Sequence, residues 1–416
     1  MTSETLSDLA LVTPGTSPKG ELINSERKGY PFFQGSKEFQ ALYPRAERFT
    51  EFPVKVAKKD DILISVRAPV GQVNIAPQDV AIGRGVMSVR PKQDSDRYFV
   101  FYLLKWLEGR WDSLGSTGSV FENLSVSALS SVEIPKVEHR ETIGRVLFQI
   151  DCKVQENSRI SKTLEDIALT IFKSWFIDFD PVKAKMDGEK PVGMDDATAA
   201  LFPDSMEDSE LGQIPSGWKL SSISDEVECV GGSTPSTSNS EFWDGDIFWT
   251  TPKDLSKQVG LVTTSSERRI TNKGLQKISS GVLPVNSVLM SSRAPIGYLS
   301  INAVPTAINQ GFIALRHSPI FTPLYLLFWL QKNMPEVKNR AGGGTFAEIS
   351  RTAFKSIPFV VPNREILQEF AELAEPILMQ LTALSLQNRD LVGLRDSLLP
   401  RLISGELQIP EEMLVP

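Results

Sequence analysis

The sequence repeats itself, and this internal repeat constrains the fold more than any other feature of the chain. Residues 62–90 and 288–316 align without a gap, and 11 of the 29 positions are identical. Each copy contains an Arg-Ala-Pro triplet, Arg67-Ala68-Pro69 in the first and Arg293-Ala294-Pro295 in the second. Because such a repeat means that one structural unit is built twice, the chain is predicted to contain two similarly folded bodies.

The repeat extends in both directions with its elements in the same order. Upstream, GYPFFQGSKEF (29–39) corresponds to GDIFWTTPKDL (245–255), and downstream YLLKWL (102–107) corresponds to YLLFWL (325–330). Short apolar runs that stop at Pro or Gly predict strands at the start of each aligned block, whereas the downstream pair predicts short buried helices. Each body is therefore predicted to belong to the α+β class.

A long helical stretch follows each body. Mainly apolar residues from Ile143 to Trp175, and again from Leu367 to Leu402, recur at alternating spacings of four and three. A sustained period of 3.5 residues is typical of a coiled-coil seam, so the two helices are predicted to pair. Asn157 and Asn388 occupy matching places on the seams. There they either fix the register of the pair or face solvent at a frayed edge.

These features divide the chain into six segments. Between Asp178 and Glu210, ten acidic residues and three lysines account for the whole net charge of −7, so this stretch is interpreted as a linker. The expected domains are a first body (1–138), a first spacer helix (139–179), an acidic linker (180–217), a second body (218–362), a second spacer helix (363–406) and a tail (407–416).

The charge distribution allows DNA as a partner in spite of the acidic total. Residues 27–59 carry eight basic and three acidic side chains, and residues 218–360 carry fourteen basic and ten acidic ones. DNA responds to the local field within a Debye length of ~8–10 Å, so acidic residues elsewhere do not prevent binding. The start of the chain does not resemble a signal peptide, and the longest apolar run, near 324–330, is too short to span a bilayer. A cytoplasmic, non-membrane protein is expected.

The sequence contains no recognisable catalytic motif. It has no Walker A pattern, no G-x-S-x-G and no adenine-methylating N-P-P-[YF] tetrapeptide, and two Cys and two His supply neither a disulfide framework nor a His-rich metal site. Gly342-Gly343-Gly344 lacks a strand–Gly–helix context and predicts a mobile loop. Asp151-Cys152-Lys153 ends like the D-x-K of many nucleases but lacks an upstream acidic partner, so we interpret it as a solvated helix face. The chain is predicted to be non-catalytic and to bind no metal.

The repeat, the two helices and three strings together resemble the specificity subunit of Type I restriction-modification systems. The strings are IFKSWFIDFDPVKAK (171–185), IPSGWKL (214–220), and GGSTPS with FWDGDIFWTTPKDL (231–236 and 242–255). The resemblance covers essentially the whole chain, with one departure. The first copy starts at Leu6 and has no counterpart of Ile214 to Leu220, so either the first body lacks an edge strand or its N-terminus is shortened.

The resemblance implies a fold and a function. It implies two target-recognition domains that each read one half of a split DNA sequence, and two helices that pair antiparallel as a spacer and dock two methyltransferase subunits. The assembly would methylate adenine with S-adenosylmethionine held by the methyltransferase. It would cleave DNA when motor-nuclease subunits, which use ATP and Mg, join it. No cofactor is expected on this chain. The alternative is a protein-scaffolding adaptor whose duplicated domains bind protein ligands and whose helices oligomerise.

Residues that are identical in both copies cannot by themselves distinguish two different half-sites, so they are expected to be scaffold or phosphate contacts. Arg67 and Arg293 fit a phosphate contact or a structural ion pair equally well, and Lys37 and Lys253 are similar. Base readers are expected where the copies diverge, in residues 40–60 and 256–280. The candidate cations there are Arg45, Arg48, Lys55, Lys58 and Lys59 in the first copy and Arg268, Arg269, Lys273 and Lys277 in the second.

Overall fold

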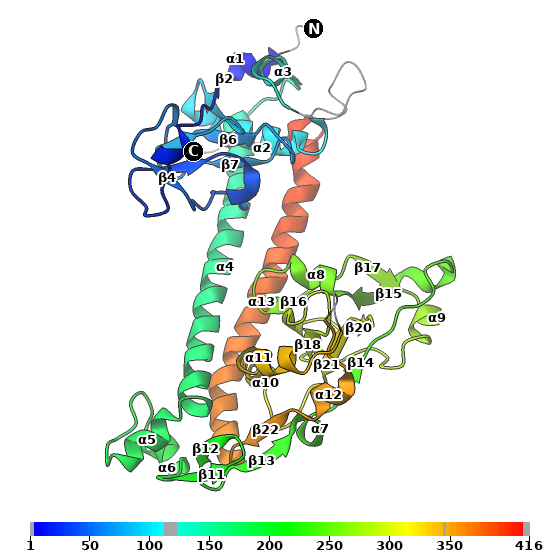
Figure 1. Ribbon diagram of the computed structural model, residues 1–416. Coiled ribbons are helices and arrows are strands. Elements are labelled where there is room, and N and C mark those ends of the chain that lie inside the picture. Colours follow the sequence, from blue (N-terminus) through cyan, green and yellow to red (C-terminus); the bar gives the residue numbers. More distant parts are fainter. Residues whose placement is uncertain (1–3, 112–122, 344–346, 411–416) are drawn as a thin grey trace. The chain divides into compact units, whose positions relative to one another are not determined.

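The computed structural model describes residues 4–111, 123–343 and 347–410 (Figure 1). The chain divides into two compact units, one that combines the residues up to Val154 with those from Asp390 onward, and one made of Gln155–Arg389. Each unit holds one copy of the repeat together with part of both long helices, α4 (Arg140–Phe176) and α13 (Arg364–Ile403). The two α+β bodies and the two long helices confirm the fold expected from the sequence. No helix in the described ranges is long and apolar enough to cross a membrane.

The first body contains two four-stranded sheets and one buried helix. The strand orders are β2 (Ala10–Pro14), β9 (Val86–Pro91), β6 (Ile62–Ser65), β7 (Val73–Ile75), and β4 (Phe49–Thr50), β3 (Tyr30–Phe33), β8 (Val80–Ile82), β5 (Val56–Ala57). Every residue of β6, β7 and β8 is buried, which explains why β6 begins as an apolar run without alternation. Helix α2 (Arg97–Leu107) packs on β7 and β9.

The second body repeats this plan. One sheet has the order β14 (Cys229–Gly231), β21 (Phe312–Leu315), β18 (Val288–Ser291), β19 (Leu299–Asn302), β16 (Val262–Thr263), and the other has the order β17 (Arg268–Ile270), β15 (Trp243–Thr250), β20 (Thr306–Ile308). Helix α10 (Pro323–Lys332) packs on β18 and β19 and corresponds to α2. The strand pairing repeats as well, because β15 runs parallel to β20, just as β3 runs parallel to β8.

Both bodies also have an edge pair of strands. In the second body β13 (Lys219–Ser222) pairs with β22 (Pro358–Val361), and in the first body β1 (Glu4–Thr5) pairs with β10 (Glu133–Ile134). Of the two alternatives for the first body, the one in which it lacks an edge strand is therefore wrong. Two residues before Leu6 are enough to form the pair, although they do not match the sequence of the longer strand.

Residues 180–217, which were expected to be a linker, are folded. They form α5 (Asp180–Met186), α6 (Asp196–Leu201) and a hairpin of β11 (Met206–Ser209) and β12 (Gly212–Pro215). Val182 and Phe202 are fully buried, and the Phe202 ring meets the Trp175 ring edge-on at 5.2 Å. All nine acidic residues of this stretch are exposed. Its composition therefore reflects its outer face and does not reveal the few apolar residues that anchor it.

The second unit shows directly how the long helices pair. Asn157 of α4 is completely buried and donates hydrogen bonds to Gln387 at 2.6 Å and to Asn388 of α13 at 2.9 Å. Further along, the Phe172 ring lies 6.1 Å from the Phe370 ring. Since the numbers rise along one helix while they fall along the other, the helices are antiparallel. The alternative in which Asn157 faces solvent is wrong.

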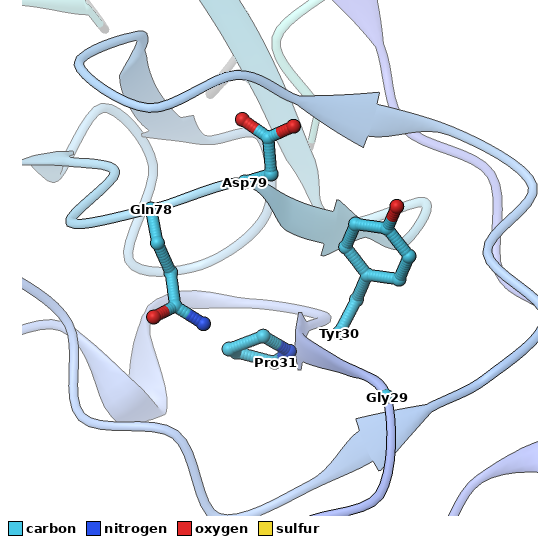
Figure 2. Close-up of a pocket in the computed structure, with 5 residues that line it drawn as sticks. All are labelled: Gly29, Tyr30, Pro31, Gln78 and Asp79. Carbon is cyan, nitrogen blue, oxygen red and sulfur yellow. The ribbon is translucent and has the colours of Figure 1, made fainter.

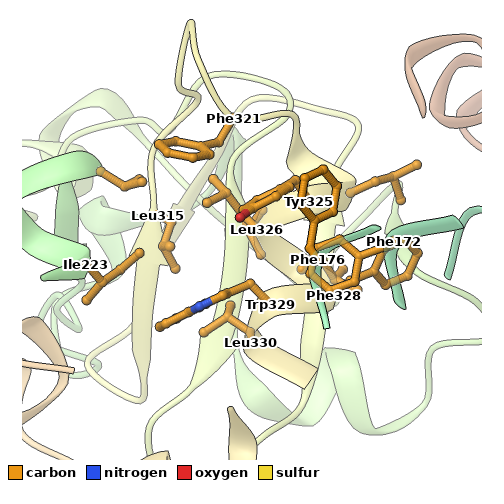
Figure 3. Packing of buried hydrophobic residues seen from close by; sticks show 14 of the residues in the cluster. Phe172, Phe176, Ile223, Leu315, Phe321, Tyr325, Leu326, Phe328, Trp329 and Leu330 are labelled. Carbon is orange, nitrogen blue, oxygen red and sulfur yellow. The ribbon is translucent and has the colours of Figure 1, made fainter. Parts of the chain in front are cut away.

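The core of the second unit is formed where α4 and α13 meet α10. Phe172 and Phe176 from α4 lie against Tyr325 and Phe328 from α10 (Figure 3), with ring centres 4.9–5.7 Å apart. Buried aromatic rings at these separations stabilise a core by about 0.5–1.5 kcal/mol per pair beyond the area they bury. The helix pair is therefore anchored into the body of the second unit.

Candidate nucleic-acid interface

The duplicated Arg-Ala-Pro triplet forms the same turn in both bodies. A buried serine precedes each triplet and donates its hydroxyl to the carbonyl of the triplet's proline at 2.7 Å, Ser65 to Pro69 and Ser291 to Pro295. Each serine oxygen also accepts a backbone N–H from beyond the turn, and the peptide bond before the proline is cis in both copies. The shared serine and proline therefore build one geometry twice.

The glycine that follows each triplet is shared for the same reason. Gly71 has a φ of +84° and Gly297 a φ of +106°, in the left-handed region that favours glycine. A Cβ atom would also approach the indole nitrogen of Trp111 to 1.8 Å in the first body and the sulfur of Met334 to 2.8 Å in the second. The identity of the serine, the proline and this glycine in both copies is thus explained by the backbone of the turn.

The arginine is the charged side chain of each turn. Arg67 is exposed and has no ion-pair partner among the described residues. Arg293 is partly exposed, and its Nη1 lies 3.5 Å from Oε2 of Glu348. An exposed pair at this distance contributes little to stability, about 0–1 kcal/mol. Both arginines therefore remain accessible to a charged partner.

A second set of cations is also shared, and it surrounds the start of β4 and β17. Lys37 pairs with Glu47 at 3.3 Å in the first body, and Lys253 pairs with Glu267 at 3.0 Å in the second. All four side chains are more than half exposed. The two lysines were expected to occupy equivalent positions in the two bodies, and the structure shows that their glutamate partners do so as well.

Arg48 and Arg268 follow these glutamates at the same place of the fold. The Phe32 amide donates to the Arg48 carbonyl, and Arg268 is the β-partner of Trp249, the residue that corresponds to Phe32. The guanidinium carbons lie 5.5 Å from the Phe32 ring centre and 5.7 Å from that of Trp249. Arg48 also donates to buried Glu38 at 2.9 Å.

This equivalence corrects the expectation that Arg48 and Arg268 belong to divergent segments. The loop between the lysine and the glutamate is four residues longer in the second body, so an alignment without gaps does not superimpose them. The sequence does contain a sign of this equivalence, because a Glu-Arg dipeptide follows the shared lysine in both copies, at a different distance in each. As shared residues, Arg48 and Arg268 cannot by themselves distinguish two half-sites.

The remaining candidates have different surroundings. Lys58 pairs with Asp79 at 2.8 Å and Lys273 with Glu241 at 3.0 Å, while Arg269 and Lys277 lie 4.5 Å and 5.8 Å from the ring centres of Phe248 and Phe242. The hydrogen bond from Lys58 lowers the pKa of the Asp79 carboxyl. Three exposed candidates have no ion-pair partner in the part of the chain that the structure describes, namely Arg45, Lys55 and Lys59.

A shallow hollow of about 280 Å³ lies beside these cations in the first body. Tyr30 and Pro31 of β3 form one side, and Gln78 and Asp79, which precede β8, form the other (Figure 2). Its open shape and its amide and phenol groups suit contact with a surface rather than enclosure of a small molecule.

Two interpretations from the sequence change at this stage. Asp151 does not lie on a solvated helix face, because it is buried and binds Arg395 at 2.5 Å. Gly342 is held by backbone hydrogen bonds with Glu348, whereas Gly344 lies outside the described residues. Within the described residues, no group of three His, Cys, Asp or Glu side chains could hold a metal ion.

Two copies of one body, each with an arginine-bearing turn and carried by a shared helix pair, define a class of protein with two similar recognition domains. The comparisons identify the class. Residues 1–166 and 215–387 match the family model described as the Type I restriction modification DNA specificity domain. The chain belongs to this family.

Individual relatives agree with the family match. The chain is 29% identical over 326 residues to the Type I restriction enzyme HindI specificity subunit of Haemophilus influenzae, over 68% of this chain and 70% of the relative. It is 37% identical over 166 residues to the MjaIX specificity subunit of Methanocaldococcus jannaschii, over 39% and 38%. The S subunit from M. genitalium has the same fold, with a TM-score of 0.59 at 16% identity over 98% of this chain and 96% of that one.

The protein is thus a DNA sequence-recognition subunit of a Type I restriction-modification system, as the resemblance implied. The adaptor alternative is not favoured. The specificity-subunit family is non-catalytic, and it implies assembly with DNA and with methyltransferase and restriction subunits.

Proposed function

We propose that the two bodies read the two halves of one split DNA target and that the duplicated turn grips the sugar-phosphate backbone in both. The observation that carries this proposal is the repetition of the turn down to its hydrogen bonds, with an accessible arginine as its charged side chain. Two half-sites of different sequence have phosphate in common at equivalent places, and phosphate contacts position a protein without specifying bases. Arg67 and Arg293 are therefore assigned to phosphate.

The same repetition supports a two-fold role for the helices. Both bodies are packed on the α4–α13 pair, so we propose that each half of the chain offers one docking place to one methyltransferase subunit, two in all. S-adenosylmethionine would be held by the methyltransferase, and ATP and Mg by the motor-nuclease subunits that join the complex in the cytoplasm. This chain supplies recognition and holds no cofactor of its own.

Arg67→Ala tests the phosphate assignment in the full chain assembled with its methyltransferase. Binding to target and non-target duplexes should weaken by similar factors. The slope of log K against log salt should fall by roughly one, because one phosphate contact fewer releases one counterion fewer. Arg293→Ala should do the same through the second body. Lys162→Ala, which removes an exposed cation of α4, is the matched control and should leave the slope unchanged.

Two outcomes would contradict the assignment. A lower melting temperature with an unchanged salt slope would make Arg67 a structural residue. Loss of discrimination at a single base pair would make it a base reader. If the unaltered complex shows no salt-dependent preference for any duplex, the recognition function itself fails.

A further inference from the structure

The two bodies differ in length in the segment that follows β4 in the first and β17 in the second. The strand registers place Thr50 and Ile270 at equivalent positions, and likewise Ala57 and Leu283. Six residues connect these positions in the first body, whereas twelve connect them in the second. Because the two half-sites differ, the residues that distinguish them are expected where the bodies differ.

In the second body the longer connection covers the sheet. It forms α9 (Asn272–Leu275), and Leu275 and Ile278 pack with Trp243 and Ile270 in one apolar cluster. The side chain of Ile278 is only 4% exposed. The apolar residues of the longer segment are therefore packed into the core of the second body.

In the first body the shorter connection leaves its apolar residues in solvent. Phe52 is 61% exposed and Val54 is 54% exposed. The Phe52 amide donates to Thr50 Oγ1 at 3.2 Å, and Thr50 is the β-partner of Tyr30, which is also exposed at the rim of the hollow in Figure 2. A group of exposed apolar side chains marks an interaction surface more often than a single one does.

The cations around this group indicate what binds there. Lys55 follows Val54 directly, and the Lys59 amide donates to Asp79 at the far side of the hollow at 2.9 Å. Both lysine side chains are exposed without an ion-pair partner among the described residues. Apolar side chains flanked by unpaired cations fit duplex DNA, which offers phosphates beside the apolar C5-methyl group of thymine in its major groove.

We propose that Phe52, with Val54 beside it, reads a thymine in the half-site of the first body by apolar contact with its C5-methyl group. This inference rests on the proposed division of the target between the two bodies. In this proposal an apolar side chain, and not a basic one, makes the first body prefer a particular base. Lys55 and Lys59 then hold the phosphates on either side of the contact.

The test replaces each thymine of the mapped target by deoxyuridine, one at a time, and so removes only the methyl group. The target is mapped first from methylated adenines in cells that express the chain with its methyltransferase. The wild-type complex should lose about fourfold in affinity at one thymine, in one half-site only, as expected for one methyl group. Phe52→Ala should bind the normal duplex correspondingly more weakly and lose nothing further on that deoxyuridine duplex.

Two controls separate the contact from the fold. Phe52→Leu keeps an apolar side chain and should retain the sensitivity to the methyl group. Leu211→Ala removes another apolar residue that is more than half exposed, from the β11–β12 hairpin, and should change nothing. The proposal is overturned if Phe52→Ala and wild type lose the same factor at every deoxyuridine, or if neither half-site contains a thymine that matters. If the wild-type complex does not prefer its mapped target over a scrambled duplex, the proposed division of the target fails instead.

Discussion

Tyr102 in α2 and Tyr325 in α10 occupy the same position of the repeat, but the side chains around them are opposite in character. The Tyr102 hydroxyl donates to Asp151 at 2.6 Å and to the Leu147 carbonyl at 3.0 Å, and Asp151 also accepts from Arg395. Around Tyr325 the neighbours are rings, with Phe172 at 5.2 Å and Phe370 at 6.1 Å. At this position one unit joins its body to the helix pair through charged and polar contacts, and the other through aromatic packing.

The difference continues three residues further along each helix. Lys105 of α2 lies 3.9 Å from Asp151, whereas its counterpart Phe328 packs on Phe172 at 5.7 Å. Burial lowers the pKa of the Lys105 ammonium and raises the pKa of the Tyr102 phenol. Apolar packing stabilises without discrimination, while a buried ion pair contributes little net stability and penalises every wrong partner. We expect the buried Asp151–Arg395 pair to add specificity to helix pairing in the first unit, as the buried Asn157–Asn388 pair does in the second.

The largest effect is expected when a charge is placed in the apolar unit. Phe328→Lys copies the residue of the first body into a site of aromatic rings, so the buried ammonium lacks the carboxylate that Lys105 has. We expect a loss of more than about 3 kcal/mol in the stability of the second unit. Phe328→Leu, the control, should cost less than about 1.5 kcal/mol. Calorimetry with hydrogen exchange in residues 155–389 measures both, and equal melting of the two variants would refute the comparison.

A smaller loss is expected when the charged site is broken. Arg395→Met leaves the buried Asp151 with the Tyr102 hydroxyl and with the Lys105 ammonium at 3.9 Å, and should cost up to roughly 3 kcal/mol in the first unit. Adding Asp151→Leu and Lys105→Phe converts the site to the chemistry of the second unit and should restore most of that stability. Denaturant midpoints of the single and triple variants measure whether this stability is restored. A triple variant as unstable as Arg395→Met would mean that the charges are essential to the packing itself.

The smallest effect concerns the buried carboxyl of the second unit. Glu165 of α4 accepts the Leu261 amide at 3.0 Å, and burial raises the pKa of its carboxyl above the usual 4.5. The folded chain then binds a proton at a pH where the unfolded chain has released it, so this group's contribution to stability is complete below pH 4.5 and declines as the pH rises through the raised pKa.

Glu165→Gln keeps an acceptor for Leu261 and removes the titration. The stability of the second unit should therefore depend less on pH across the acidic range and be slightly higher at neutral pH, which urea midpoints measured from pH 4 to 7 would show. Asp166→Asn is the control, since Asp166 pairs with Lys162 at the surface. The Asp166 variant should retain the pH dependence of the wild type. A Glu165→Gln variant with the wild-type slope would rule out the buried carboxyl as its source.

Much of the fold could be predicted from the sequence because its signals are local or repeated. The turn around Arg67 and Arg293 depends on serine, proline and glycine within seven residues, so the same letters produce the same backbone twice. The helix pair was predictable because a period of 3.5 residues marks the buried face of any two helices that pair. In these elements the residues that create the structure are neighbours in the chain.

Tertiary structure alone decided the features whose partners are distant. Asp151 reads as one more surface acid until Arg395, 244 residues away, is placed beside it, and the acidic stretch reads as a linker until Phe202 meets Trp175. The equivalence of Arg48 and Arg268 was hidden by a loop of different length and emerged from strand pairing. Phe52 was overlooked because the sequence shows that a residue is apolar, whereas its exposure depends on which segments fold over it, and only the second body has a helix to do so.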